Sequence, residues 1–166
     1  MKKPNTIATV AALLALLCAT AQAHIVLEQK EAEAGTLYKA VFKVGHGCDG
    51  SATRQIVVTI PAGFRGARPT PKAGWTLTRS VDEISWAAKT EGDYLQDDWY
   101  DEFVLRGSLP DQPGELWFKV RQVCEKGEAN WAEVPAAGAS ANGLKMPAPH
   151  VTVSTRTSGA ATEHHH

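Results

Sequence analysis

The stretch Thr36–Val44, TLYKAVFKV, decides the fold class of this chain. Its apolar side chains fall on every second position, at Tyr38, Ala40, Phe42 and Val44. Two of the positions between them are lysines, Lys39 and Lys43. Successive side chains of a β-strand point to opposite faces, so this alternation predicts a strand with one buried face.

Similar stretches recur along the chain, separated by segments rich in Gly and Pro, and none holds a helical period over three turns. We predict further strands at Ile25–Glu28, Gln55–Ile60, Trp75–Arg79, Glu83–Trp86, Glu102–Arg106, Glu115–Cys124 and His150–Thr155. Ile84 and Trp86 are expected to face the core. Short strands at this spacing predict an all-β protein, a β-sandwich.

The N-terminus has the features of an export signal. Two lysines precede the apolar stretch 7–20, and Ala21-Gln22-Ala23 matches the small-x-small pattern that signal peptidase cleaves. We therefore predict a signal peptide at residues 1–23, cleavage between Ala23 and His24, a domain at 24–155 and a loose tail at 156–166. The mature protein is expected to be soluble, periplasmic or secreted, and without a membrane anchor.

Composition and charge exclude some partners. The chain has 17 Lys and Arg against 18 Asp and Glu, a net charge of −1. Removal of the predicted signal takes two lysines, so the mature charge is 15 − 18 = −3. Lys and Arg are scattered along the sequence, which predicts no nucleic-acid partner and no cluster suited to anionic lipid.

The predicted export decides how the cysteines are interpreted. Cys18 leaves with the signal, and Cys48 and Cys124 remain. An even pair in an oxidising compartment predicts a disulfide. The alternative, a pair of thiolate metal ligands, is less favoured because two isolated cysteines far apart in the sequence make a poor metal site.

His24 becomes the first residue of the mature chain. Its free α-amine and its imidazole Nδ1 can then chelate one metal ion. Free α-amines and imidazoles in general can give up a proton to a metal near neutral pH, and the pair suits Cu(II), which favours tetragonal nitrogen and oxygen ligands. The alternative is that a histidine beside the cleavage site is incidental.

Three more residues are candidates for the same site. Asp49 lies in the turn His46–Gly50, HGCDG, and offers a carboxylate; its ordinary role is to form the turn before Gly50. His46 is the second-choice ligand, or else a loop histidine bonded to backbone. Trp131 has no lone pair to give a metal and could cover an axial face, although most tryptophans pack in a core.

These motifs together resemble the YcnI-like copper-binding domain family. The resemblance covers nearly the whole mature chain and is carried by His24–Leu27, Gly35, Tyr38, His46–Thr53, Ile60-Pro61, Gly74-Trp75, Ile84–Trp86, Phe103, Leu109-Pro110, Gly114, Gln122–Cys124 and Gly127–Trp131. It implies an immunoglobulin-like or cupredoxin-like sandwich. It also implies one Cu(II) bound by the amine and imidazole of His24 and a carboxylate, carried over to Asp49, with Trp131 nearby.

The function expected from these observations is periplasmic Cu(II) binding for storage or delivery, without catalysis. The expected partners are the copper ion and another periplasmic or membrane copper protein. One alternative is a copper-dependent polysaccharide monooxygenase, whose copper site, a histidine brace, needs a second histidine ligand. Another is a metal-free structural or adhesion module. The run His164–His166 could be a purification-tag remnant or a native metal-collecting end, and both interpretations stay open.

Overall fold

The stretch Thr36–Val44 contains the interior strand β3 (Leu37–Val44) in a computed structural model of the protein, which describes residues 24–156. Its alternating apolar face is buried as predicted: Tyr38, Ala40, Phe42 and Val44 are each at most 2% exposed. The predicted signal peptide, all but the first residue of the predicted tail and the His164–His166 run lie outside the described residues.

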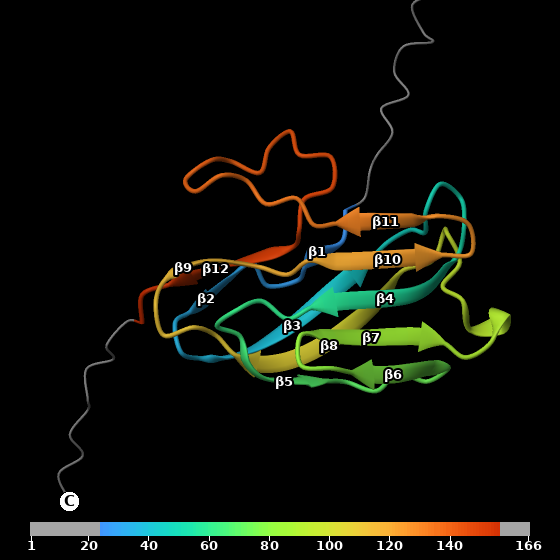
Figure 1. Ribbon diagram of the computed structural model, residues 1–166, viewed down its shortest axis with the longest axis horizontal. Coiled ribbons are helices and arrows are strands. Elements are labelled where there is room, and N and C mark those ends of the chain that lie inside the picture. The colour runs from blue at the N-terminus through green and yellow to red at the C-terminus, as the bar shows by residue number, and fades with distance from the viewer. Residues whose placement is uncertain (1–23, 157–166) are drawn as a thin grey trace, which may run out of the picture.

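The strands form three sheets (Figure 1). The first has the order β1-β3-β8-β5, the second β11-β10-β4-β7-β6 and the third β2-β12-β9. Besides β3, the bounds are β1 (Val26–Leu27), β2 (Glu31–Glu33), β4 (Thr53–Thr59), β5 (Arg65–Pro69), β6 (Trp75–Arg79), β7 (Glu83–Ala88), β8 (Asp101–Ser108), β9 (Gly114–Trp117), β10 (Val120–Cys124), β11 (Glu128–Trp131) and β12 (His150–Ser154).

The core lies between the first two sheets. Phe42 and Phe103 of the first sheet belong to the same buried cluster as Ile56 and Trp86 of the second. Trp86 packs edge-to-face on Phe103, with the ring centroids 5.7 Å apart. The expected core positions of Ile84 and Trp86 are confirmed, at 0% and 1% exposure, and the predicted β-sandwich is the observed fold.

The prediction of a single strand over Glu115–Cys124 is wrong. The chain changes sheets at Phe118 and Lys119, so that β9 pairs with β12 while β10 pairs with β4 and β11. Phe118 is fully buried at this break, edge-on to Phe42 at 5.5 Å. The alternation of side chains passes through the break unaltered, which is why the sequence pattern does not reveal it.

Three short strands were not predicted: β2, β5 and β11. β5 contains Gly66 at φ +63° and ends at Pro69, and its register against β8 shifts between Arg65 and Arg68. Such a strand carries turn-forming residues and no clear alternation. Among the described residues, no helix is long and apolar enough to cross a bilayer.

Candidate metal site

The HGCDG segment forms a tight turn directly after β3. The backbone N–H of Cys48 donates to the Ser51 carbonyl, and that of Ser51 to the Cys48 carbonyl, both at 2.9 Å. The two residues between them have positive φ, +48° at Asp49 and +79° at Gly50. A two-residue turn with both central residues at positive φ favours Asp-Gly, so the turn-forming role considered for Asp49 is confirmed.

The predicted disulfide is present. Cys48 and Cys124 are bonded, with their Cα atoms 6.0 Å apart. The bond joins the turn to the end of β10, which lies in the other sheet from β3. The turn that carries Asp49 is therefore fixed to both sheets of the sandwich.

A buried glutamine on β10 connects three parts of this region. The side chain of Gln122 is fully buried. Its Nε2 donates to the His46 carbonyl at 2.7 Å and to Thr53 Oγ1 at 2.8 Å. Its Oε1 accepts a hydrogen bond from the indole Nε1 of Trp131 at 3.1 Å. The amide thus fixes the indole orientation and the start of the HGCDG turn together.

Trp131 is in ring contact with both candidate histidines. It ends β11 and is 2% exposed. The ring of His24 meets it edge-to-face with centroids 5.5 Å apart, and the ring of His46 does so at 6.3 Å. The indole is therefore both a core residue, as the ordinary interpretation held, and a neighbour of the predicted N-terminal ligand.

A surface groove of about 380 Å³ runs beside Trp131. His46 and Asp49 line it from the turn, and Asp97, Glu128 and Met146 line it from other segments. Asp97 also accepts a hydrogen bond from the backbone N–H of Gly47 at 3.0 Å. The groove therefore offers an imidazole, a thioether and three carboxylates.

The structure brings together Asp49, His46 and Trp131, and separately His24 and Trp131. His24 does not line the groove that contains Asp49; it lines a neighbouring hollow of about 140 Å³ that also includes His150. Within residues 24–156, no group of three or more His, Cys, Asp or Glu side chains is arranged to hold a metal ion. The assignment of Asp49 as a ligand beside His24 thus stays a prediction.

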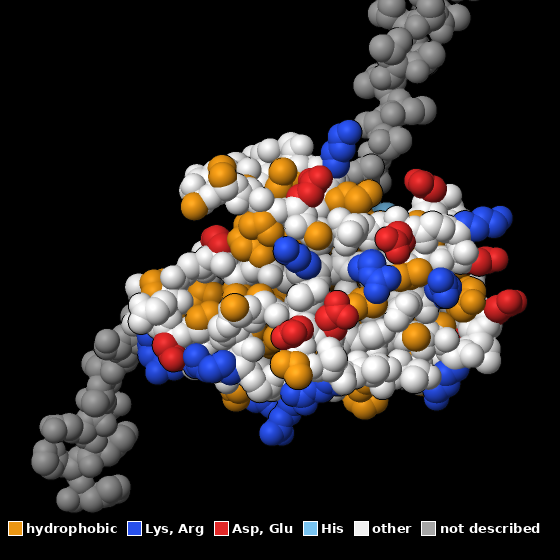
Figure 2. All heavy atoms as spheres, viewed as in Figure 1, with side chains coloured by type: hydrophobic (Ala, Val, Ile, Leu, Met, Phe, Trp, Pro, Cys, Tyr) orange, Lys and Arg blue, Asp and Glu red, His pale blue; other side chains and the backbone are white. Residues whose placement is uncertain are grey.

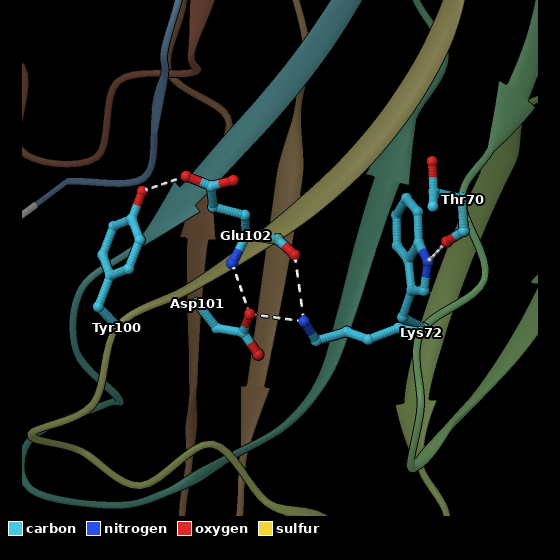
Figure 3. Close-up of polar contacts among 6 residues, drawn as sticks. Thr70, Lys72, Tyr100, Asp101 and Glu102 are labelled. Atoms are coloured by element: carbon cyan, nitrogen blue, oxygen red, sulfur yellow. Dashed lines mark hydrogen bonds and ion pairs between the residues drawn. The ribbon is translucent and has the colours of Figure 1, made fainter.

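The segment that delivers Asp97 is fixed at both ends. Leu95 exchanges backbone hydrogen bonds with Thr53. Further along, Asp101 binds the Lys72 ammonium, and the hydroxyl of Tyr100 donates to Glu102 at 2.6 Å (Figure 3). This hydrogen bond to the Glu102 carboxylate, with desolvation and nearby negative charge, raises the pKa of Tyr100 to about 12.

The family assignment follows from comparison with known proteins. The model of the family described as "Domain of unknown function (DUF1775)" matches residues 24–80 and 76–153. The chain belongs to this family. The description assigns no function to DUF1775, so the match supports the resemblance at the level of the domain and leaves copper binding untested.

Solved structures support the fold of this DUF1775 domain. The chain is 26% identical to an uncharacterized protein from Nocardia farcinica with an immunoglobulin-like fold; the TM-score is 0.67, over 80% of this chain and 99% of that one. It is 15% identical to the seventh ScaB type I cohesin from Pseudobacteroides cellulosolvens, with a TM-score of 0.47 over 86% and 97% of the chains. The second likeness is too weak to inform function. No curated protein matches the chain.

Several residues of the candidate site were not predicted from the sequence. Gln122 is part of the quoted family pattern, but its polar side chain on the buried face of β10 was a signal in its own right, because a buried amide needs partners. Asp97 and Met146 lie in irregular segments, where no periodic pattern predicts which way a side chain points. Glu128 begins the strand β11 that was not predicted.

Proposed function

We propose that the protein is an exported Cu(II)-binding protein that stores or delivers copper and holds the ion at His24. The observation that carries the proposal is the contact of the His24 ring with Trp131, 5.5 Å between centroids. Through Gln122, that same indole is tied to the start of the HGCDG turn. The residue predicted to be the mature N-terminus thus contacts an indole that is hydrogen-bonded, through Gln122, to the turn that carries Asp49.

The chemistry of His24 favours copper. After cleavage before His24, the α-amine and Nδ1 supply two nitrogen ligands from one residue. Cu(II) has the highest affinity of the common divalent metals for such a donor set and accepts a tetragonal arrangement. Both nitrogens must be deprotonated to bind, so copper uptake is expected to release protons and to weaken in acid.

A carboxylate is expected to complete the ligand set and to offset the charge of the ion. Asp49 is the first choice because its turn is fixed by the disulfide and by the bridge to Ser51. Asp97 and Glu128 line the same groove, so their carboxylates serve as controls for that of Asp49. The indole of Trp131 has no lone pair to donate, so its expected role is to cover one face of the ion.

The first test compares two forms of the protein. One begins at His24, and the other carries one extra residue before it, which keeps the imidazole and removes the amine chelate. Copper affinity is measured by competition with a chelator of known affinity. The processed form is expected to bind far more tightly, and equal affinity would overturn the proposal.

The second test assigns the carboxylate. Asn tolerates positive φ, so Asp49→Asn keeps the turn while removing the charge. We expect this variant to weaken Cu(II) binding, whereas Asp97→Asn and Glu128→Gln leave it nearly unchanged. If Asp49→Asn has no effect and His46→Ala removes a nitrogen ligand from the spectrum, the ligand assignment is wrong.

One observation favours an enzymatic alternative. The ring of His46 lies against the same indole as His24, and its Nδ1 is within hydrogen-bond distance of the Gly47 carbonyl. In the neutral ring this contact places the proton on Nδ1 and the lone pair on Nε2, as in a metal-ligating histidine. Two histidines are what a polysaccharide monooxygenase requires. Oxidative cleavage of chitin or cellulose by the copper-loaded protein with a reductant would support this alternative.

The metal-free alternative is a structural or adhesion module. Metal analysis of protein processed at His24 separates it from both copper functions, because a structural module should carry and retain no copper. A stoichiometric copper content after dialysis would exclude it.

A further inference from the structure

Three cationic side chains lie in one row across the first sheet. Lys39 of β3 is directly opposite Arg106 of β8, and Arg106 is directly opposite Arg68 of β5. Residues opposite one another on neighbouring strands point to the same face. All three are exposed. Lys and Arg side chains project along the lower edge of Figure 2, beneath the position of β5 in Figure 1.

The row is not neutralised within the described residues. The structure gives Lys39, Arg68 and Arg106 no ion pair anywhere in residues 24–156. Like charges directly opposite on a sheet are destabilising. Elsewhere on the same two strands the pairing is complementary, since Lys43 is opposite Glu102. The row therefore holds three positive charges without an ion pair among the described residues, and an anionic partner would neutralise them.

The row borders a groove. Arg65, Arg68 and Arg106 line this hollow of about 350 Å³, together with Leu37 and the small residues of β5 and β8. Arg65 is paired with Asp111 at 3.0 Å, in an exposed ion pair that solvent weakens. Leu37 is 64% exposed, which places a large apolar side chain at the rim of the cationic groove.

The row brings together cations that are scattered along the sequence. Lys39, Arg68 and Arg106 are far apart in the chain, and the antiparallel pairing of β3, β8 and β5 brings them into register. Because this pairing is long-range, the linear distribution of charge gives no sign of the cluster.

We propose that this face docks on the phosphate headgroups of an anionic lipid surface. Guanidinium groups bind phosphate oxygens through paired hydrogen bonds. The row crosses two strand spacings, roughly 10 Å, which is wider than one phosphate and suits an array of headgroups. The exposed Leu37 would enter the boundary between headgroups and acyl chains, as apolar residues of peripheral membrane proteins do.

The proposed orientation leaves the candidate metal site accessible. Leu37 begins β3, whereas His46 and the HGCDG turn follow its other end. The lipid-facing end and the metal-facing end therefore lie at opposite ends of one strand. The docking proposal rests on the cationic row and the exposed Leu37, and it does not depend on copper binding.

The test uses the chain processed at His24 and vesicles of phosphatidylcholine with or without phosphatidylglycerol. Three cations near an anionic surface together give about a hundredfold preference for the anionic vesicles at low salt. We expect the protein to sediment with the anionic vesicles and to be released by high salt. Equal sedimentation with both vesicles would overturn the proposal.

Charge-matched variants locate the surface. Arg68→Gln with Arg106→Gln should abolish sedimentation, and removing repulsion should leave the fold at least as stable. The control, Arg79→Gln with Lys89→Gln, removes the same charge from exposed positions near β6 and β7 and should bind like the parent. Equal loss in both pairs would refute a specific face.

Two further measurements distinguish the source of the phosphate. Leu37→Ser should weaken vesicle binding while keeping every charge. If inorganic phosphate shifts the NMR signals of the groove arginines but the protein does not sediment with vesicles, the site is one for a free ion and the lipid proposal is wrong. If an acidic protein is captured instead of vesicles, the proposal is equally wrong.

Discussion

The buried amide of Gln122 gives a sharp test of how the site is held together. Gln122→Met keeps the length of the side chain and removes both its donors and its acceptor. The substitution takes a partner from the His46 carbonyl, the Thr53 hydroxyl and the Trp131 indole N–H. A buried polar group that loses its partner costs about 1–3 kcal/mol.

The summed effect is smaller than three independent losses, because neighbouring groups relax and Thr53 keeps a weak contact to the sulfur of Cys124 at 3.8 Å. We expect the free energy of unfolding to fall by about 2–5 kcal/mol, measured by urea denaturation under oxidising conditions with an unchanged m-value. Gln96→Met is the control, because Gln96 is exposed. A loss below about 1 kcal/mol would refute the structural role assigned to this amide.

Three more predictions concern stability. Burial raises the pKa of Tyr38 from 10 to about 12, so this tyrosine loses its proton at lower pH in the unfolded state than in the folded one. The free energy of unfolding should therefore be unaffected by the titration of this group below about pH 10 and fall by about 2–3 kcal/mol toward pH 12. Tyr38→Phe should remove that contribution to the pH dependence of the urea midpoint. Replacing Cys48 and Cys124 by Ser should cost roughly 4.5 kcal/mol in the chain-entropy model, and two reactive thiols in unreduced protein isolated after export would contradict the bond. A Cβ at Gly47 would lie 1.9 Å from the carbonyl oxygen across the turn, whereas one at Gly45 meets nothing within 4 Å. Gly47→Ala should therefore lower the thermal midpoint by an amount equivalent to about 1–3 kcal/mol, and Gly45→Ala should hardly change it.

Local patterns predicted most of the sandwich. The alternation in β3 and the positions of Ile84 and Trp86 are set by side-chain period, which a sequence displays directly. The disulfide was predicted from the expected export and from the even count of the remaining cysteines. The change of sheet at Phe118 escaped prediction because it alters the strand partner and leaves the alternation intact.

Long-range contacts account for what was not predicted in the site. Asp97 reaches the turn by a hydrogen bond to Gly47, fifty residues away in the chain. The cationic row depends likewise on the register of three strands. Neither arrangement has a periodic signal. The sequence predicted that His24 is the first residue of the mature chain and can chelate a metal. It did not predict the contact of His24 with Trp131, which the structure shows.

The most direct test of the proposed function is the electron paramagnetic resonance spectrum of the protein processed at His24 with one equivalent of Cu(II). We expect a tetragonal signal with two nitrogen ligands and oxygen ligands besides, and we expect it to change when one residue precedes His24. A spectrum identical in the two forms, or one of unbound aqueous copper in the processed form, would contradict copper binding at His24.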